Sequence, residues 1–167
     1  AEDGQWIYLP SQGRHLRIAE GRRTSYVMGS DFTYEDLDPE DLDTYRWRLL
    51  GEEPLDGHAC FVVEAVPAGE REARRSGYAK RIAHVDRETF VTWQVEFFDR
   101  SGILCKIQKN RAFERTPNGA VRAREMEMEN LAKHHRTLLS VEALDFEERL
   151  EENHFSRHFV TSGRCLE

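Results

Sequence analysis

The chain has 167 residues, of which 39% are hydrophobic and 33% are charged, and its formal net charge is −7. The length suits one domain with a real core, and the hydrophobic fraction excludes a disordered chain. The acidic balance argues against a protein that holds nucleic acid by its phosphates, and the apolar runs are too short to span a membrane.

The first residues predict two short strands. Residues 5–9 and 14–19 are separated by Pro10-Ser11-Gln12-Gly13, a combination typical of a turn. Side chains alternate between the two faces of a strand, so Trp6 and Tyr8 are expected on the same face.

A tight turn and one short helix are predicted next. Gly29 can take a positive φ, which suits a sharp turn. Thr33 and Asp36 have the spacing of a capping box, and Pro39 prevents the helix from continuing. The helix would turn its apolar side toward a sheet through three side chains: Phe32, Tyr34 and Leu37.

The remainder of the chain predicts a series of strands. Seven stretches carry strand-like apolar patterns and are separated by turn signals: residues 43–51, 60–66, 78–85, 90–99, 103–113, 121–131 and 135–144. Strands do not alternate with helices in a βαβ pattern, and no glycine-rich phosphate loop occurs. The sequence therefore predicts a mainly β protein with an antiparallel meander.

Three connecting regions are less regular. Asp56-Gly57 is a strong hairpin signal, but the flanking residues predict a connection longer than two residues. Residues 67–77 predict an exposed polar loop, for which a solvated linker is favoured over a functional basic patch. Residues 147–159 fit either a short helix or an irregular tail.

Strand alternation also predicts a bulky apolar stripe on one face of the sheet. Its members are Trp6, Tyr8, Tyr45, Trp47, Leu49, Phe61, Trp93, Val95 and Phe97. A stripe of this kind can be a packed core or the wall of a ligand cavity. The residues alone favour the packed core.

No group of side chains predicts catalysis or a metal site. His154 and His158 are four residues apart, but two ligands do not make a zinc site. Cys60 and Cys105 have no neighbouring base in the sequence, and buried free thiols are favoured over a disulfide. We therefore expect no enzymatic activity, no cofactor and no bound metal.

Five stretches of the chain match, in order and spacing, the motifs of one known family. They are Trp6-Ile7-Tyr8-Leu9-Pro10, Met28 to Leu37, Tyr78-Ala79-Lys80-Arg81 with Val85-Asp86-Arg87-Glu88-Thr89-Phe90, Glu96-Phe97-Phe98-Asp99, and Gly102-Ile103-Leu104-Cys105-Lys106. Together they extend over most of residues 5–160, which argues against chance. The chain thus resembles the outer-membrane lipoprotein-sorting protein family, the LolA-like proteins of bacterial periplasms.

The resemblance implies a fold and a function. The fold would be a curved antiparallel sheet that forms an incomplete, half-open barrel, with one or two short helices across its mouth. The function would be that of a non-enzymatic periplasmic carrier, which buries lipid or lipoprotein acyl chains in an apolar cavity for transfer toward the outer membrane. An inner-membrane lipid transporter of the resistance-nodulation-division (RND) type would be a partner. The alternative is an envelope-stress sensor of the same fold that recognises lipoproteins or a protein partner.

The resemblance also reverses the interpretation of the apolar stripe, whose members become candidates for the wall of a lipid cavity. Phe32, Tyr34 and Leu37 become candidates for a lid that refills this cavity. Family members carry a secretion signal and a further segment ahead of the first motif. We therefore expect residues 1–167 to be a single LolA-like domain that lacks an N-terminal segment of the full-length protein.

Overall fold

The computed structural model describes residues 5–9, 12–18, 23–38, 42–144, 146 and 151–161. The chain divides into two compact units. The first unit combines Ala1–Arg22 with Leu144–Glu167, and the second unit is Arg23–Ala143. The second unit is called the sheet unit below.

The first unit contains a two-stranded hairpin and two short helical elements. β1 (Gln5–Leu9) pairs antiparallel with β2 (Arg14–Ile18), so both predicted strands are confirmed. The 3-10 turn η4 (Glu152–Phe155) and the helix α3 (Arg157–Thr161) form in the C-terminal region, where a short helix was one of two predictions. Residues 147–150 of that prediction lie outside the described residues. In the described part of the chain, no helix has both the length and the apolar character needed to cross a membrane.

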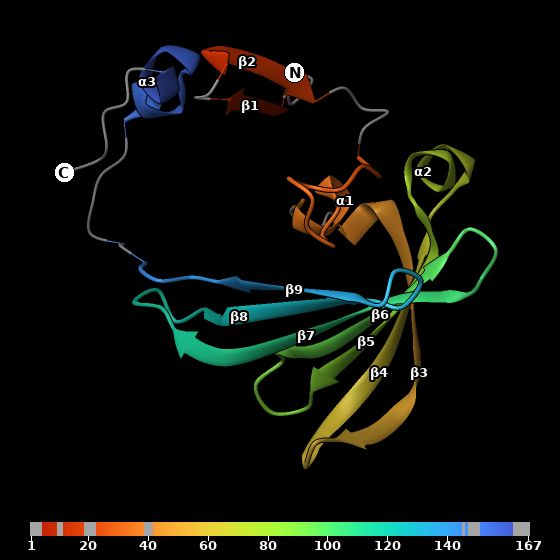
Figure 1. Cartoon of the computed structure of the whole chain (residues 1–167). Helices are drawn as coiled ribbons and strands as arrows, with labels where there is room; N and C mark the ends of the chain where they lie inside the picture. The colour runs from red at the N-terminus through yellow and green to blue at the C-terminus, as the bar shows by residue number, and fades with distance from the viewer. Residues whose placement is uncertain are drawn as a thin grey trace. The chain divides into compact units, whose positions relative to one another are not determined.

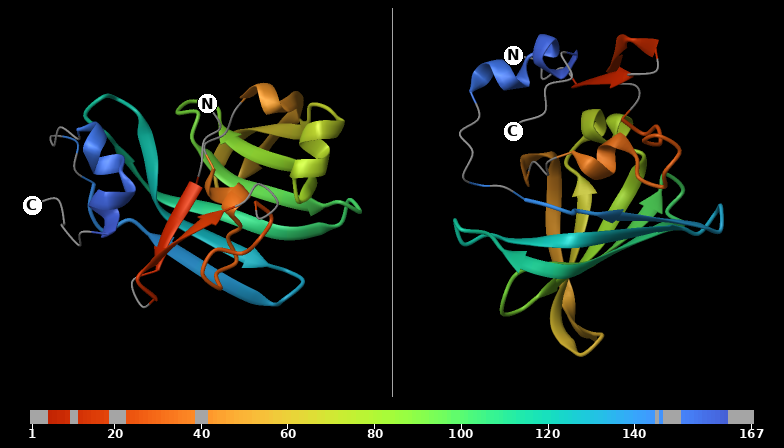
Figure 2. Two further views of the ribbon diagram at one scale, coloured as in Figure 1. Left: turned by 90° about the horizontal axis from the view of Figure 1, so that it is seen from above. Right: turned by 60° about the vertical axis from the view of Figure 1, so that its left-hand side comes forward.

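The sheet unit is built on one seven-stranded antiparallel sheet (Figure 1). Its strands lie side by side in chain order: β3 (Tyr45–Leu55), β4 (His58–Pro67), β5 (Tyr78–Asp86), β6 (Thr92–Asp99), β7 (Leu104–Arg115), β8 (Val121–Asn130) and β9 (His135–Ser140). β3 and β9 are the two edges, so the sheet does not close on itself. The sheet is strongly curved (Figures 1 and 2), which confirms the predicted incomplete barrel.

Two connections differ from their predictions. Asp56-Gly57 is a two-residue turn rather than a longer one, because both residues take a positive φ, 48° and 87°, as a type I′ hairpin requires. The predicted loop at residues 67–77 contains the helix α2 (Glu70–Arg75). Glu70 in its first turn pairs with Arg74 at 3.2 Å, and this i,i+4 pair also matches the helix dipole, which stabilises the short helix.

Residues 23–38, called the α1 segment, lie over one face of the curved sheet (Figures 1 and 2). The segment turns at Gly29, whose φ is 79°, and then forms the helix α1 (Tyr34–Leu37). The backbone N–H of Thr33 donates to the Asp36 carboxylate at 2.7 Å, which is the Asp36 half of the predicted capping box. The 3-10 turn η3 (Leu42–Thr44) then leads into β3.

The hydrophobic core lies between the α1 segment and the sheet. Its four buried members are Phe32, Tyr78, Phe97 and Met128, and Val95, Cys105, Met126 and Leu139 pack against them. Phe32 comes from the α1 segment and the others from β5, β6 and β8, so the core joins the two layers. Cys60 and Cys105 are free thiols, as predicted, and Cys165 lies outside the described residues.

Candidate ligand cleft

A cleft of about 210 Å³ opens on the face of the sheet that carries α1. It is lined by Asp36, Asp38, Trp47, Val63, Ala65, Arg81, Ala83, Thr92, Val95, Phe97, Gln108 and Asn110. The strand register explains why space remains here. Val63 pairs with Ala83, and Ala83 pairs with Val95, so three small apolar side chains lie in a row across β4, β5 and β6. We call these three residues the floor row.

One end of the cleft is charged. The Arg81 guanidinium there donates to the Glu35 carboxylate at 3.1 Å. The guanidinium carbon also lies 5.2 Å from the ring centroid of Tyr45 and 5.4 Å from those of Tyr78 and Phe97. These distances are in the range of cation–π attraction. A buried carboxylate and three aromatic rings therefore hold the Arg81 cation between the cleft and α1.

The other end of the cleft is polar but uncharged. Gln108 and Asn110 are two residues apart on β7, so their side chains point to the same face. Asn110 Nδ2 donates to the carbonyl oxygen of Thr92 at 2.8 Å, and Gln108 Nε2 donates to Asn110 Oδ1 at 2.8 Å. The cleft is thus apolar in its middle and polar at both ends, which suits an amphiphilic molecule.

A buried ion pair fastens the α1 segment to the sheet. The Asp36 side chain is fully buried, and its carboxylate accepts from Lys106 Nζ at 3.0 Å and from the Tyr78 hydroxyl at 2.8 Å. Burial raises the pKa of Tyr78 far above its ordinary value, and the Asp36 charge raises it further. The phenol therefore stays protonated and remains a donor to Asp36.

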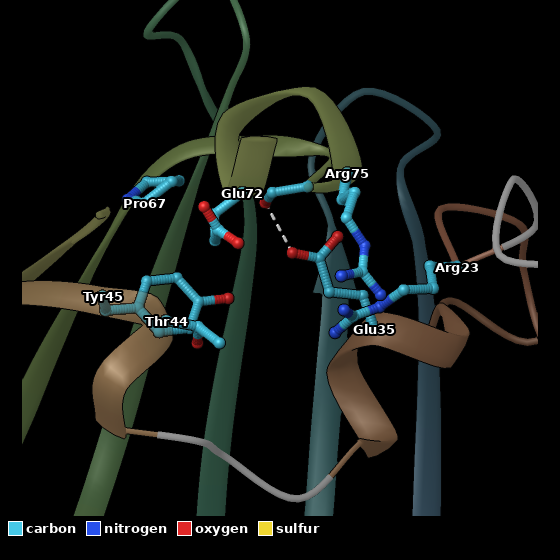
Figure 3. Close-up of a pocket in the computed structure, with 8 residues that line it drawn as sticks. Arg23, Glu35, Thr44, Tyr45, Pro67, Glu72 and Arg75 are labelled. Atoms are coloured by element: carbon cyan, nitrogen blue, oxygen red, sulfur yellow. Dashed lines mark hydrogen bonds between the residues drawn. The ribbon is translucent and has the colours of Figure 1, made fainter. Parts of the chain in front are cut away.

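Glu35 provides a second attachment (Figure 3). Its carboxylate accepts from Ser76 Oγ at 2.5 Å and from the Gly77 N–H at 2.8 Å, in addition to the Arg81 contact. Figure 3 shows Glu35 reaching from α1 toward the end of α2, at a small pocket of about 40 Å³ that Arg23 and Arg75 also line. The pocket is much smaller than the cleft, and we assign it a structural role.

Asp31 provides a third attachment, to the edge strand β9. Its carboxylate accepts from Thr137 Oγ1 at 2.7 Å and lies 2.6 Å from His135 Nδ1. Burial alone would raise the pKa of Asp31, but the hydrogen bonds from Thr137 and His135 and the nearby charges of His135 and Lys133 lower it. Asp31 is thus held as a carboxylate where the α1 segment meets β9.

Three members of the predicted stripe lie together in the cleft: Trp47, Val95 and Phe97. Trp47 is 40% exposed, and its indole N–H donates to the carbonyl oxygen of Leu42 at 3.0 Å. Tyr45 lines the neighbouring small pocket instead, next to Arg81.

Four further members lie elsewhere. Leu49 is 60% exposed near the edge of the sheet. Phe61 is half-buried, with the Arg87 guanidinium 5.5 Å from its ring centroid. Tyr8 is half-buried in the first unit, and the side chain of Trp6 lies outside the described residues.

Trp93 does not line the cleft, although strand alternation predicts that it shares a face with Val95. Thr92 and Gln94 pair with two adjacent residues of β5, so Trp93 is an extra residue between them. Such a β-bulge changes which face the following side chains reach. Strand alternation does not count this extra residue, and Trp93 lies outside the lining of the cleft.

Trp93 belongs to a second cavity, of about 170 Å³. Its ring stacks on His58, with 4.0 Å between centroids, and meets the Phe113 ring edge-on at 4.7 Å. The indole Nε1–H lies 3.3 Å from Asp86 Oδ2. Asp86 therefore connects Trp93 to the turn between β5 and β6.

Asp86 gives this region a defined pH dependence. Backbone and side-chain hydrogen bonds from Thr89 lower the pKa of Asp86 from 3.8 to about 2. A lowered carboxyl pKa stabilises the fold at pH values above 3.8, and this stability is lost as the pH falls toward 2.

We expect Asp86→Asn to lower the urea midpoint at pH 7, and the difference from the wild type to shrink between pH 4 and pH 2. Glu88→Gln, an exposed change in the same turn, should leave the midpoint almost unchanged; a constant Asp86→Asn difference down to pH 2 would contradict the assignment.

The three residues of the predicted lid have different surroundings. Phe32 is 2% exposed and belongs to the core, Tyr34 is half-buried, and Leu37 is 44% exposed. None of the three lines the cleft. The α1 segment instead contributes the carboxylates of Asp36 and Asp38 to the cleft wall.

Sequence reasoning missed the polar residues of the cleft. The available signal was the polar alternation of Lys106, Gln108 and Asn110 along one strand. This polar alternation is outweighed by the apolar residues Cys105 and Ile107, which alternate with it. They indicate that the strand turns Cys105 and Ile107 inward and its polar residues outward. A strand that turns its polar side inward is the reverse of the usual pattern.

Comparisons with known proteins agree with this architecture. A family model described as that of an uncharacterized protein matches residues 1–162. A search of curated proteins found no match. Among solved structures, a domain described as an outer membrane lipoprotein-sorting protein from Vibrio parahaemolyticus superposes with a TM-score of 0.88. It is 33% identical over 96% of this chain and 67% of that chain.

Two more distant structures show the same fold. A DUF1329 family protein from Desulfovibrio piger has a TM-score of 0.86 and 23% identity over 95% of this chain and 65% of that chain. A LolA superfamily protein from Nitrosomonas europaea has a TM-score of 0.69 and 21% identity, over 93% of this chain and 67% of that chain. The chain thus spans about two thirds of the length of each of these proteins. With its identity to the Vibrio domain over nearly all of its residues, the chain belongs to the outer-membrane lipoprotein-sorting protein family of LolA-like proteins.

Proposed function

We propose that this protein is a non-enzymatic periplasmic carrier that holds an acyl chain of a lipid or lipoprotein in the cleft for transfer toward the outer membrane. The observation that carries the proposal is the floor row of Val63, Ala83 and Val95, whose small side chains leave a cleft of about 210 Å³ beside α1. The description of the 33% identical Vibrio domain as a lipoprotein-sorting protein supports the same role.

Burial of the acyl chain supplies the free energy of binding. Each methylene that leaves water for an apolar surface contributes about 0.8 kcal/mol. Trp47 and Phe97 belong to the row of paired residues next to the floor row, so an acyl chain on the floor row can contact both rings. A few buried methylenes are then enough for measurable affinity, and no reactive side chain is needed.

Release matters as much as binding for a carrier. Six of the twelve residues that line the cleft are polar, so only part of an acyl chain can lose its water there. Affinity is therefore limited, and a tighter acceptor can take the load. The family resemblance points to an RND-type lipid transporter in the inner membrane as a partner.

Replacing Trp47 or Trp93, one at a time, tests by fluorescence where an acyl chain binds; Trp6 is present in both variants. Trp47 lines the cleft and Trp93 lines the second cavity. We expect palmitic acid to shift the tryptophan emission of the wild type and of Trp93→Phe, because the chain removes water from Trp47. The Trp47→Phe variant should lose this shift while it still binds the fatty acid in a direct assay.

Two results would contradict the proposal. A response that survives in Trp47→Phe and disappears in Trp93→Phe would move the ligand to the second cavity. A protein that binds neither fatty acid nor phospholipid at any concentration below their aggregation limit would remove the carrier function and favour the sensor alternative.

A further inference from the structure

Two neighbouring carboxamides in the cleft fix each other's orientation. The carbonyl oxygen of Thr92 can only accept, so the Asn110 group 2.8 Å from it must be the amide nitrogen. Asn110 Oδ1 therefore faces the other way, toward Gln108, and accepts from Gln108 Nε2 at 2.8 Å. The usual ambiguity between the oxygen and nitrogen of an amide is thus resolved for both side chains.

The consequence is a fixed acceptor at the edge of the apolar floor. Gln108 pairs with Val95 in the strand register, so its side chain continues the floor row by one position. Its Nε2 donates to Asn110, and its Oε1 has no hydrogen-bond donor among the described residues. A ligand that covers the floor row displaces water from this oxygen. If the ligand offers no donor, the oxygen is left without a partner, which lowers the affinity.

We infer that Gln108 makes the cleft selective for amide-linked acyl chains over ester-linked ones. This inference rests on the proposed function and names the linkage that the cleft recognises. An amide has an N–H next to the acyl chain that can donate to Gln108 Oε1, whereas an ester in the same place has only acceptors. Asn110 is a positioning residue here, because it keeps the Gln108 oxygen directed away from Thr92.

Two probes that differ in one atom test the inference. Both carry the same palmitoyl chain and the same fluorescent head, joined through an amide in one probe and through an ester in the other. We expect the wild type to bind the amide probe about two- to tenfold more tightly, which is the effect of one hydrogen bond. Gln108→Met has nearly the same shape but no acceptor oxygen. It should bring the two affinities together, because the amide probe loses its hydrogen bond and the ester probe no longer leaves an acceptor without a partner.

Two further variants separate this role from a general effect on the fold. Asn110→Ala leaves Gln108 in place but frees its amide to rotate, so the preference should shrink. Gln94→Met changes a glutamine of β6 that lies outside the cleft and donates to Glu96 at 3.3 Å, so the preference should persist.

The possible failures can be told apart. If the wild type binds both probes equally, the inference is wrong and the carrier function stands. The inference also fails if Gln108→Met and Asn110→Ala both keep the full preference. If neither probe binds the wild type, the proposed function fails and the inference fails with it.

Discussion

Replacing Lys106 by methionine is expected to lower the free energy of unfolding by about 3–5 kcal/mol. Lys106 is 4% exposed and the Asp36 side chain is fully buried, so the variant leaves a carboxylate without its cation in a site that water does not reach. The Tyr78 hydroxyl and the Thr33 N–H still donate to Asp36, but neutral donors do not replace the charge. Urea unfolding at pH 7, followed by circular dichroism, measures the loss.

Two comparisons isolate the buried pair. The double variant Lys106→Met/Asp36→Asn should recover much of the stability, because the asparagine carries no charge and can still accept from Tyr78. The Arg111 side chain is 53% exposed, and its guanidinium lies 3.9 Å from the Glu127 carboxylate. Arg111→Met should therefore lower the free energy of unfolding by less than about 1 kcal/mol. Equal losses in Lys106→Met and Arg111→Met would show that the Lys106–Asp36 pair does not hold the α1 segment.

Filling the floor of the cleft is expected to weaken acyl-chain binding by roughly fiftyfold. Ala83→Leu adds three carbon atoms to the middle residue of the floor row and displaces about three methylenes of the ligand, worth about 2.4 kcal/mol. The added side chain occupies space that is already open to a ligand, so the free energy of unfolding should change little. Titration with a fluorescent fatty acid gives the dissociation constant, and urea unfolding gives the stability.

Ala59→Leu is the matched control. Ala59 is an exposed alanine of β4 that does not line the cleft, so this variant should bind like the wild type. An Ala83→Leu protein that is stable and binds the fatty acid with unchanged affinity would show that the ligand does not lie on the floor row. Equal weakening in both variants would point to a general effect of added leucine.

Local sequence patterns predicted most of the sheet because its strands obey local rules. β3 to β9 alternate their side chains and are separated by turn residues, and the capping box at Thr33 depends only on residues within one helical turn. The helix α2 was missed because its charged residues also suit a solvated loop. Within a few residues of Glu70, the i,i+4 pair with Arg74 is the one feature that favours a short helix over a solvated loop.

The cleft was predicted less completely because it depends on register and on distant partners. Trp93 is an extra residue in the pairing of β6 with β5 and lies outside the cleft. The alternation of side chains along one strand cannot reveal such an extra residue. Arg81 and Lys106 are inward-facing cations that are tolerated because Glu35 and Asp36 arrive from another part of the chain. A sequence pattern cannot place such partners, which lie 46 and 70 residues away.

The attachments of the α1 segment join parts of the chain that are far apart in sequence. Asp31 meets Thr137 across 106 residues and Asp36 meets Lys106 across 70, whereas each strand of the sheet pairs with its neighbour in the chain. Closing a long loop costs more chain entropy than closing a hairpin, so local pairing is favoured first. We therefore expect the hairpins of the sheet to form early and the α1 segment, although it precedes them in the chain, to dock last. Amide hydrogen exchange should then be faster in α1 than in β5 to β8, through openings that leave the sheet intact.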